Sequence, residues 1–251
     1  MKKIEIRVLN PEVISECERM CVAAARLTQR GEKIKNIKDF MILYNKGFQP
    51  ETLRTMVNLP HPTLQKFGVI NVVIVGASRR FLAQITRHQN EVKFMSASLQ
   101  YSDYSGEADF CMPYEIMEAG EKATERYLKN CEQIMDEYQF FAKQGVNNDA
   151  CGYMAPQGLR NVLIISATPY QWKHMIQQRT CRRNTSETRY IMLRIWEQLY
   201  ALSPILFENA GPKCIYEKCP EGKMSCGKKC PNDIHEILKG DFPLIYEDRN
   251  Y

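Results

Sequence analysis

The sequence lacks the features of a membrane protein or of a nucleic-acid coat. No apolar run approaches the roughly 20 residues that a membrane helix needs, and Glu5 and Arg7 interrupt the start MKKIEIRVLN, which has no signal-peptide core. Neither sign of charge is in large excess, since 34 Lys and Arg residues against 29 Asp and Glu residues give a net charge of +5. That excess suits anionic small ligands better than nucleic acid. We expect a cytoplasmic protein with no membrane or nucleic-acid partner.

Internal repeats and low-complexity segments are also absent, which excludes repeat architectures. The 251 residues, 44% of them hydrophobic, are enough to bury a sizeable core without disulfides or metals. Beyond Gly211 the chain becomes rich in Gly, Lys and Cys and loses its periodicity. We therefore predict one domain over residues 1–210 and a Cys-rich tail over residues 211–251.

Hydrophobic periodicity predicts both strands and helices along the chain. Strands are expected at 3–9, 67–76 and 161–168, and helices at 11–28, 79–88, 116–138, 170–180 and 184–206. Asn10 and Ser78 are candidate helix caps, Asn184 and Glu187 have the spacing of a capping box, and residues 90–106 are expected to form a loop. The predicted fold class is α/β (α+β): a single domain with a central, mostly antiparallel sheet packed by long helices, plus a short irregular C-terminal tail.

A first group of polar residues falls at helical spacing. Arg80, Gln84, Arg87 and His88 lie at i, i+4, i+7 and i+8, which places all four on one face of a continuous helix. Guanidinium, amide and imidazole donors in one stripe suit a phosphate or the carbonyl edge of a pyrimidine. The alternative is a solvated polar face. The loop that follows favours a site, because it carries five hydroxyl-bearing residues between positions 96 and 104.

A second group lies in the segment KHMIQQRTCRRNTSETR, at residues 173–189. Helical spacing puts His174 and Gln178 on one face, and Arg179 and Arg183 on another. Four arginines between 179 and 189 exceed what a helix surface needs for solubility. A ligand site and a set of helix salt bridges, with Glu187 balancing Arg183, are both open.

Residues 61–101 resemble the core of the flavin-dependent thymidylate synthases. The family pattern is a His, a small hydroxyl residue, a strand ending in a Gly-small-Ser-Arg turn, and then Gln-x-x-Arg-His-Arg. The matching residues are His61, Thr63, Gly76, Ala77, Ser78, Arg79, Gln84, Arg87, His88 and Gln89, followed by Ser98 and Tyr101. The resemblance continues through Pro156, Gln157, His174, Arg179, Arg183, Glu187 and Arg189, and through the tail CPEGKMSCGK.

The resemblance implies a homotetramer whose active sites draw residues from more than one subunit. It implies FAD bound by His61, Arg87, His88, Gln89, His174 and Arg183, and dUMP bound by Gln84, Arg87, Ser98, Gln100, Tyr101 and Arg179. Arg179 and Ser98 are the candidate catalytic residues. A guanidinium at the carbonyl edge of the pyrimidine would stabilise the negative charge that develops as C5 becomes nucleophilic.

The implied reaction is the FAD-dependent reductive methylation of dUMP to dTMP, with methylenetetrahydrofolate as carbon donor and NADPH as reductant. Several family cations are missing: Gln89 and Gln100 stand where the family has Arg, Gly152 stands near another Arg, and Thr168 and Tyr170 replace an Asn-x-Arg. A relative that keeps the flavin and acts on a different pyrimidine nucleotide is therefore an alternative. A zinc or nucleic-acid binding module is a third hypothesis.

Four of the ten cysteines crowd into the tail, at Cys214, Cys219, Cys226 and Cys230. Four thiolates in one short segment could form a tetrahedral zinc site, and His235 could replace one ligand. The spacing is not the paired CxxC of a zinc ribbon. Disulfides or unpaired thiols are equally compatible with it.

Overall fold

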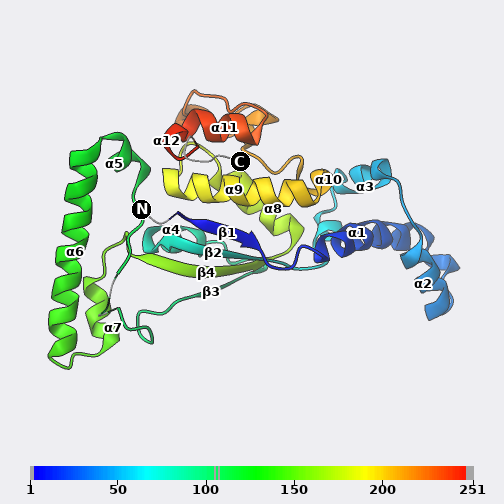
Figure 1. The fold of residues 1–251 in the computed structure, drawn as a ribbon. Coiled ribbons are helices and arrows are strands. Elements are labelled where there is room, and N and C mark those ends of the chain that lie inside the picture. Colours follow the sequence, from blue (N-terminus) through cyan, green and yellow to red (C-terminus); the bar gives the residue numbers. More distant parts are fainter. Residues whose placement is uncertain (1–2, 105, 107, 247–251) are drawn as a thin grey trace.

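The structure is a computed structural model that describes residues 3–104, 106 and 108–246. Its centre is a four-stranded antiparallel sheet with the strand order β1-β2-β4-β3 (Figure 1). The strands are β1 (Glu5–Val8), β2 (Ile70–Ser78), β3 (Val92–Ser96) and β4 (Arg160–Ala167). The predicted antiparallel sheet is confirmed. Residues 1–2 and 247–251 of the predicted domain and tail, and residue 105 of the predicted loop, lie outside the described residues.

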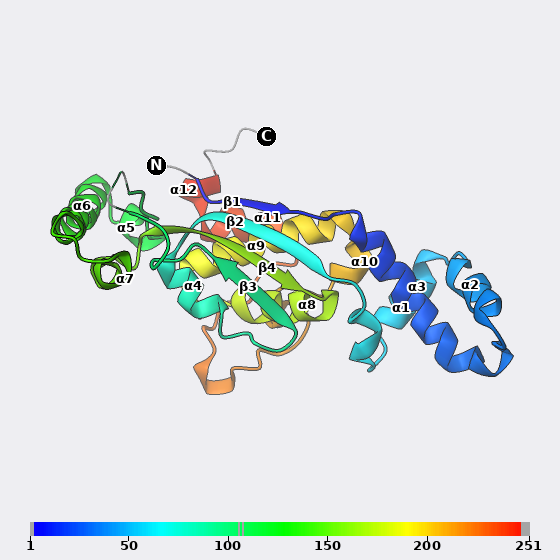
Figure 2. The same cartoon turned by 90° about the horizontal axis from the view of Figure 1, so that it is seen from below.

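Helices cover one face of the sheet and extend from both of its ends (Figures 1 and 2). They are α1 (Val13–Arg30), α2 (Ile37–Asn45), α3 (Pro50–Val57), α4 (Arg79–Ile85), α5 (Tyr114–Glu118), α6 (Glu121–Lys143), α7 (Asn148–Cys151), α8 (Pro169–Arg179), α9 (Ser186–Leu202), α10 (Pro204–Phe207), α11 (Ile234–Asp241) and α12 (Pro243–Tyr246). Short 3-10 turns are η1 (Gly31–Lys33), η2 (Pro62–Gln65), η3 (Gly152–Met154), η4 (Lys213–Ile215) and η5 (Gly222–Met224). In the described part of the chain, no helix has the length and apolar character required to cross a membrane.

Helix α9 is the centre of the core. Ile191, Met192 and Leu193 are three consecutive, fully buried residues, so α9 is apolar around most of its circumference. The helix lies between the sheet and α11, and α1 and α6 extend away at opposite ends of the molecule (Figures 1 and 2). The sheet, α9 and α11 thus form three successive layers, and the C-terminal segment is part of the fold.

Three local predictions differ from the structure. Asn10 does not cap α1, because its side chain donates to the Val69 carbonyl at 2.9 Å and accepts from the Asn71 amide at 2.8 Å, tying the chain after β1 to β2. The helix predicted over 116–138 is divided into α5 and α6 at Gly120, whose φ of 97° a side chain would disfavour. Strand β3 lies in a segment predicted as loop.

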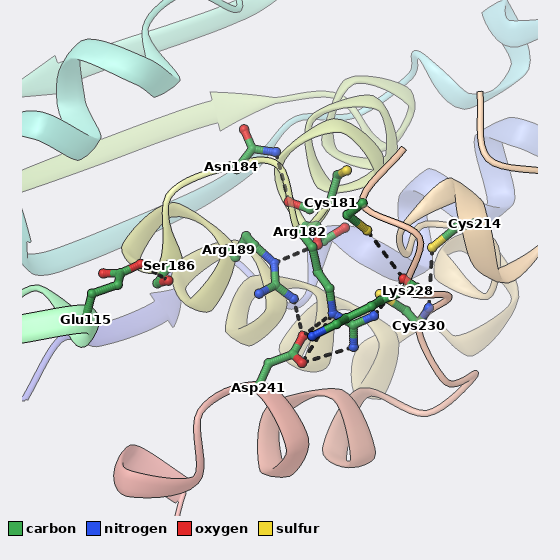
Figure 3. A network of polar contacts seen from close by, with 12 residues as sticks. Glu115, Cys181, Arg182, Asn184, Ser186, Arg189, Cys214, Lys228, Cys230 and Asp241 are labelled. Carbon is green, nitrogen blue, oxygen red and sulfur yellow. Dashed lines mark hydrogen bonds and ion pairs between the residues drawn. The ribbon is translucent and has the colours of Figure 1, made fainter. Parts of the chain in front are cut away.

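The C-terminal segment, expected to be irregular, also contains a regular helix. In α11, Ile237 and Leu238 are buried against the core. At the end of this helix the Asp241 carboxylate forms ion pairs with Arg182 at 3.0 Å and with the buried Arg189 (Figure 3). Since a buried charge is costly without a partner, these pairs bind the segment to the α8–α9 region.

Candidate functional site

Helix α4 begins as the sequence predicts and ends earlier. Ser78 caps it, accepting from the Phe81 amide at 3.0 Å, and the Ser78 hydroxyl donates to Glu187 at 2.5 Å. The helix ends at Ile85, and the His88 amide donates back to the Ile85 carbonyl at 3.1 Å in the turn that follows. Arg87 and His88 therefore leave the helix. The prediction that they share one helical face with Arg80 and Gln84 is wrong.

Helix α8 presents the second group of polar residues. Thr168 caps it, and its last residue is Arg179. His174 and Gln178 share a face as predicted, with their side-chain nitrogens 3.0 Å apart. Arg183 lies in the loop before α9, so the predicted shared face of Arg179 and Arg183 is wrong.

The turn after α4 and the exposed side of α8 enclose a cavity of about 480 Å³, which we call the α4–α8 cavity. Most of the residues predicted to bind FAD meet here. The lining residues are Arg87, His88, Gln89, Asn90, Tyr170, Gln171, His174, Gln178 and Arg179. Side chains that come from positions 91 residues apart in the sequence thus form one polar surface.

Arg179 is held by three acceptors. Its Nε donates to His88 Nε2 at 2.8 Å, one terminal nitrogen donates to the Gln84 carbonyl at 3.0 Å, and the other donates to Asn184 Oδ1 at 3.3 Å. A guanidinium is a donor only, so His88 Nε2 must carry no proton. This arrangement fixes the plane of a half-buried cation at the cavity wall.

The two histidines of the cavity are held neutral. Burial, then the charge of Arg179 and that of His174 when it is protonated, lowers the pKa of His88 from 6.5 to about 4. Burial and the charge of Lys213 also lower the pKa of His174. The rings pack edge to face with centroids 5.9 Å apart. The cavity therefore presents uncharged imidazoles beside the guanidiniums of Arg87 and Arg179 at neutral pH.

Other predicted site residues lie away from this cavity. The side-chain oxygen of Gln84 accepts from the hydroxyls of Thr188 at 2.8 Å and Thr185 at 3.2 Å, which joins α4 to α9. Ser98 Oγ accepts from the backbone amides of the next turn, donated by Gln100 at 3.0 Å and Tyr101 at 3.4 Å. The lining of the α4–α8 cavity does not include residues 98, 100 and 101, and Tyr101 is 82% exposed. His61 is exposed and also lies outside it.

The ion pairs around α9 also differ from the predicted helix salt bridges. Glu187 accepts from the Ser78 amide at 2.7 Å, and it does not balance Arg183. Asn184, predicted in a capping box with Glu187, donates instead to the Gln178 carbonyl at 2.7 Å and accepts from Arg179 at 3.3 Å. It also donates to the Cys181 carbonyl at 3.2 Å (Figure 3). The role of Asn184 could not be found by sequence reasoning, because it depends on the turn between α8 and α9.

The four tail cysteines do not form a metal site. Within residues 3–104, 106 and 108–246, no three His, Cys, Asp or Glu side chains are grouped to hold an ion, so the zinc prediction has no support. The thiols have different surroundings: Cys226 is exposed, whereas Cys230 is buried and its amide donates to Cys214 Sγ at 3.5 Å. All four, including Cys219, are free thiols.

The fold agrees with the comparisons to known proteins. The Thy1 family profile, described as thymidylate synthase complementing protein, matches residues 12–205, and the chain belongs to this family. The flavin-dependent thymidylate synthase of Geobacter sulfurreducens is 23% identical over 220 residues, covering 87% of this chain and 90% of that protein. The enzyme of the same name from Thermococcus onnurineus is 24% identical over 191 residues, covering 72% and 77%.

Solved structures share the fold at lower identity. The UMP/dUMP methylase PolB from Streptomyces cacaoi, bound with 5-Br dUMP, superposes with a TM-score of 0.62 at 14% identity, over 83% of this chain and 95% of that one. Thymidylate synthase X from Helicobacter pylori, with FAD and dUMP, superposes with a TM-score of 0.56 at 15% identity, over 83% and 99%. These likenesses establish the ThyX-like mixed α/β fold.

Proposed function

We propose that the protein catalyses the FAD-dependent reductive methylation of dUMP to dTMP, with methylenetetrahydrofolate as carbon donor and NADPH as reductant. The observation that carries the proposal is the meeting of Arg87, His88, His174 and Arg179 around one cavity. Family membership and the flavin-dependent relatives support it.

The donors of the α4–α8 cavity fit a flavin. Arg87 offers a guanidinium, Gln89 and Gln178 offer amides, and the neutral imidazoles of His88 and His174 add no positive charge. Guanidinium groups suit phosphates, and amides suit the carbonyl and nitrogen edge of a fused ring. When bound, FAD would supply the hydride chemistry that no side chain can perform. Arg183 and His61, outside this cavity, remain proposals as FAD ligands.

Arg179 is the residue proposed to act on the pyrimidine. Its guanidinium would lie at the carbonyl edge of the base and stabilise the negative charge there as C5 attacks the carbon donor. His88 is a positioning residue: by accepting from Arg179 Nε it fixes the guanidinium before substrate binds. Gln84 contributes through its backbone carbonyl, which accepts from a terminal nitrogen of the Arg179 guanidinium.

A second candidate function is C5 methylation of a different pyrimidine nucleotide, such as UMP. The fold likeness to a UMP/dUMP methylase supports it, as do Gln89 and Gln100 at positions where the family has Arg. Both activities need the same Arg179. They differ in whether the site accepts a ribose 2′-hydroxyl.

The test is release of tritium from the C5 position of labelled dUMP and UMP, in the presence of methylenetetrahydrofolate and NADPH. Wild-type protein should carry a flavin absorption spectrum and release tritium. Arg179→Ala should lose turnover and keep the flavin, while Arg126→Ala, an exposed control on α6, should keep both. Arg179→Ala with undiminished turnover would reject the assignment, and release from UMP alone would favour the second candidate.

We also propose that Ser98, Gln100 and Tyr101 act in the site of a second subunit of a homotetramer. They lie outside the α4–α8 cavity of their own chain, and the family resemblance implies shared sites. Co-expressed Ser98→Ala and Arg179→Ala chains should then regain part of the activity that each lacks alone, because mixed assemblies contain some sites with both residues intact. Additive residual activity without any gain would contradict sharing.

A further inference from the structure

A larger cavity of about 750 Å³ is also lined by Arg179. We call it the C-terminal cavity. The end of α8 and the α8–α9 loop form one wall, and parts of the segment from Pro212 to Cys230 form the other. Its volume is in the range that small-molecule sites usually have.

The lining of this cavity is strongly cationic. Two glutamates, Glu217 and Glu221, face seven cations: Arg179, Arg182, Arg183, Lys213, Lys218, Lys228 and Lys229. Asp241 pairs with Arg182 from outside the cavity and shares its one negative charge with Arg189. Arg183 and the four lysines form no ion pair with the described residues. The excess charge is therefore available to an anionic ligand.

The walls are fixed relative to each other. Arg182 donates to the Lys228 carbonyl at 2.8 Å, which joins the segment to the α8–α9 loop (Figure 3). Cys230 is buried, and its amide contacts Cys214 Sγ. Lys228 and Lys229 thus stand on an anchored backbone, so a ligand does not have to order the loop that carries them.

The C-terminal cavity adjoins the α4–α8 cavity. Gln178 and Arg179 line both of them. Lys213 lines the C-terminal cavity and is close enough to His174 to act on its ionisation. A molecule bound in the C-terminal cavity would therefore reach the group that we propose acts on the pyrimidine.

We propose that the C-terminal cavity binds the phosphate groups of a nucleotide used at the adjoining site. Lysine ammonium and arginine guanidinium groups are the usual protein donors to phosphate oxygens. On the proposed function, which this inference deepens, the nucleotide is the nicotinamide reductant, whose pyrophosphate and 2′-phosphate carry several negative charges. The phosphate of dUMP has the same chemistry and is the other source that the test separates.

The test measures dissociation constants of NADP⁺, NAD⁺ and dUMP by calorimetry, without turnover. The variant is Lys228→Gln with Lys229→Gln. The matched control is Lys122→Gln with Lys129→Gln, which removes the same charge from exposed positions on α6. Loss of charge-assisted hydrogen bonds should weaken NADP⁺ binding about tenfold or more in the double variant at Lys228 and Lys229, and the control should bind as the wild type does.

Comparison of the three dissociation constants identifies the phosphate group that the cavity binds. Weakening of NADP⁺ but not NAD⁺ assigns the 2′-phosphate to the cavity, weakening of both assigns the pyrophosphate, and weakening of dUMP alone assigns the substrate phosphate. If all three dissociation constants in the variant equal those of the control, the inference is overturned. Lys213→Gln provides a second variant with the same expectation. Because binding is measured without turnover, absence of dTMP formation in the wild type would reject the proposed function separately.

Discussion

Acid should destabilise the protein through His88. The residue is 9% exposed, and burial, Arg179 and His174 lower the pKa of its imidazole from 6.5 to about 4. In the unfolded chain the His88 imidazole takes up a proton near pH 6.5. In the folded protein it does so only near pH 4. Between these two pH values the unfolded state therefore binds more protons than the folded state, and the free energy of unfolding falls as the pH falls. Linkage gives a loss of about 2 kcal/mol in the free energy of unfolding between pH 7 and 5.

The assay is urea unfolding of wild type and His88→Gln at both pH values. Glutamine keeps an acceptor for Arg179 Nε and does not titrate, so the variant should lack most of this loss. Asp241 does not interfere, because its arginine partners lower the pKa of its carboxyl and its contribution is lost only below about pH 4. The exposed His61→Gln serves as control and should retain the wild-type loss. An equal loss in wild type and His88→Gln would refute the reasoning.

Three further predictions concern an ion pair, a helix cap and the reactivity of two thiols. Asp241→Asn should lower the free energy of unfolding by about 3 kcal/mol in urea, because the buried Arg189 loses its counter-charge. Ser78→Ala should cost about 1–2 kcal/mol in the same assay, because it removes a helix cap and a charged hydrogen bond. A thiol reagent at neutral pH should alkylate Cys226 before Cys230, whose pKa burial raises to about 12, as peptide mass mapping would detect.

Elements with a strong local pattern could be predicted from the sequence. Residues 70–78 and 160–167 are rich in β-branched residues, and Ile70, Ile74 and Ile165 are fully buried. Strand β3 is not rich in β-branched residues, since Val92 is the one such residue in it. Val92 and Phe94 face the core, and Lys93 and Met95 are exposed. Its strand conformation depends on pairing with β4, about 70 residues away in sequence, which the pattern of five residues cannot reveal.

Helix ends and ion pairs were beyond local reasoning for a similar reason. A stripe at i, i+4, i+7 and i+8 predicts one face only if the helix continues, and α4 stops at Ile85. The family pattern includes Arg189, but its partner Asp241 lies 52 residues later, in a segment without strong periodicity. The residues of the site could be named, whereas the contacts that hold them depend on tertiary structure.

The early end of α4 explains how two consecutive residues serve different purposes. On a continuous helix, Arg87 and His88 would be separated by about 100° and both would remain at the surface of the same element. In the turn that follows Ile85, His88 is buried and accepts from Arg179, while Arg87 stays exposed at the cavity mouth. One dipeptide therefore supplies both the group that positions Arg179 and a guanidinium that is accessible to an anionic ligand. Both functions require that the helix end before them.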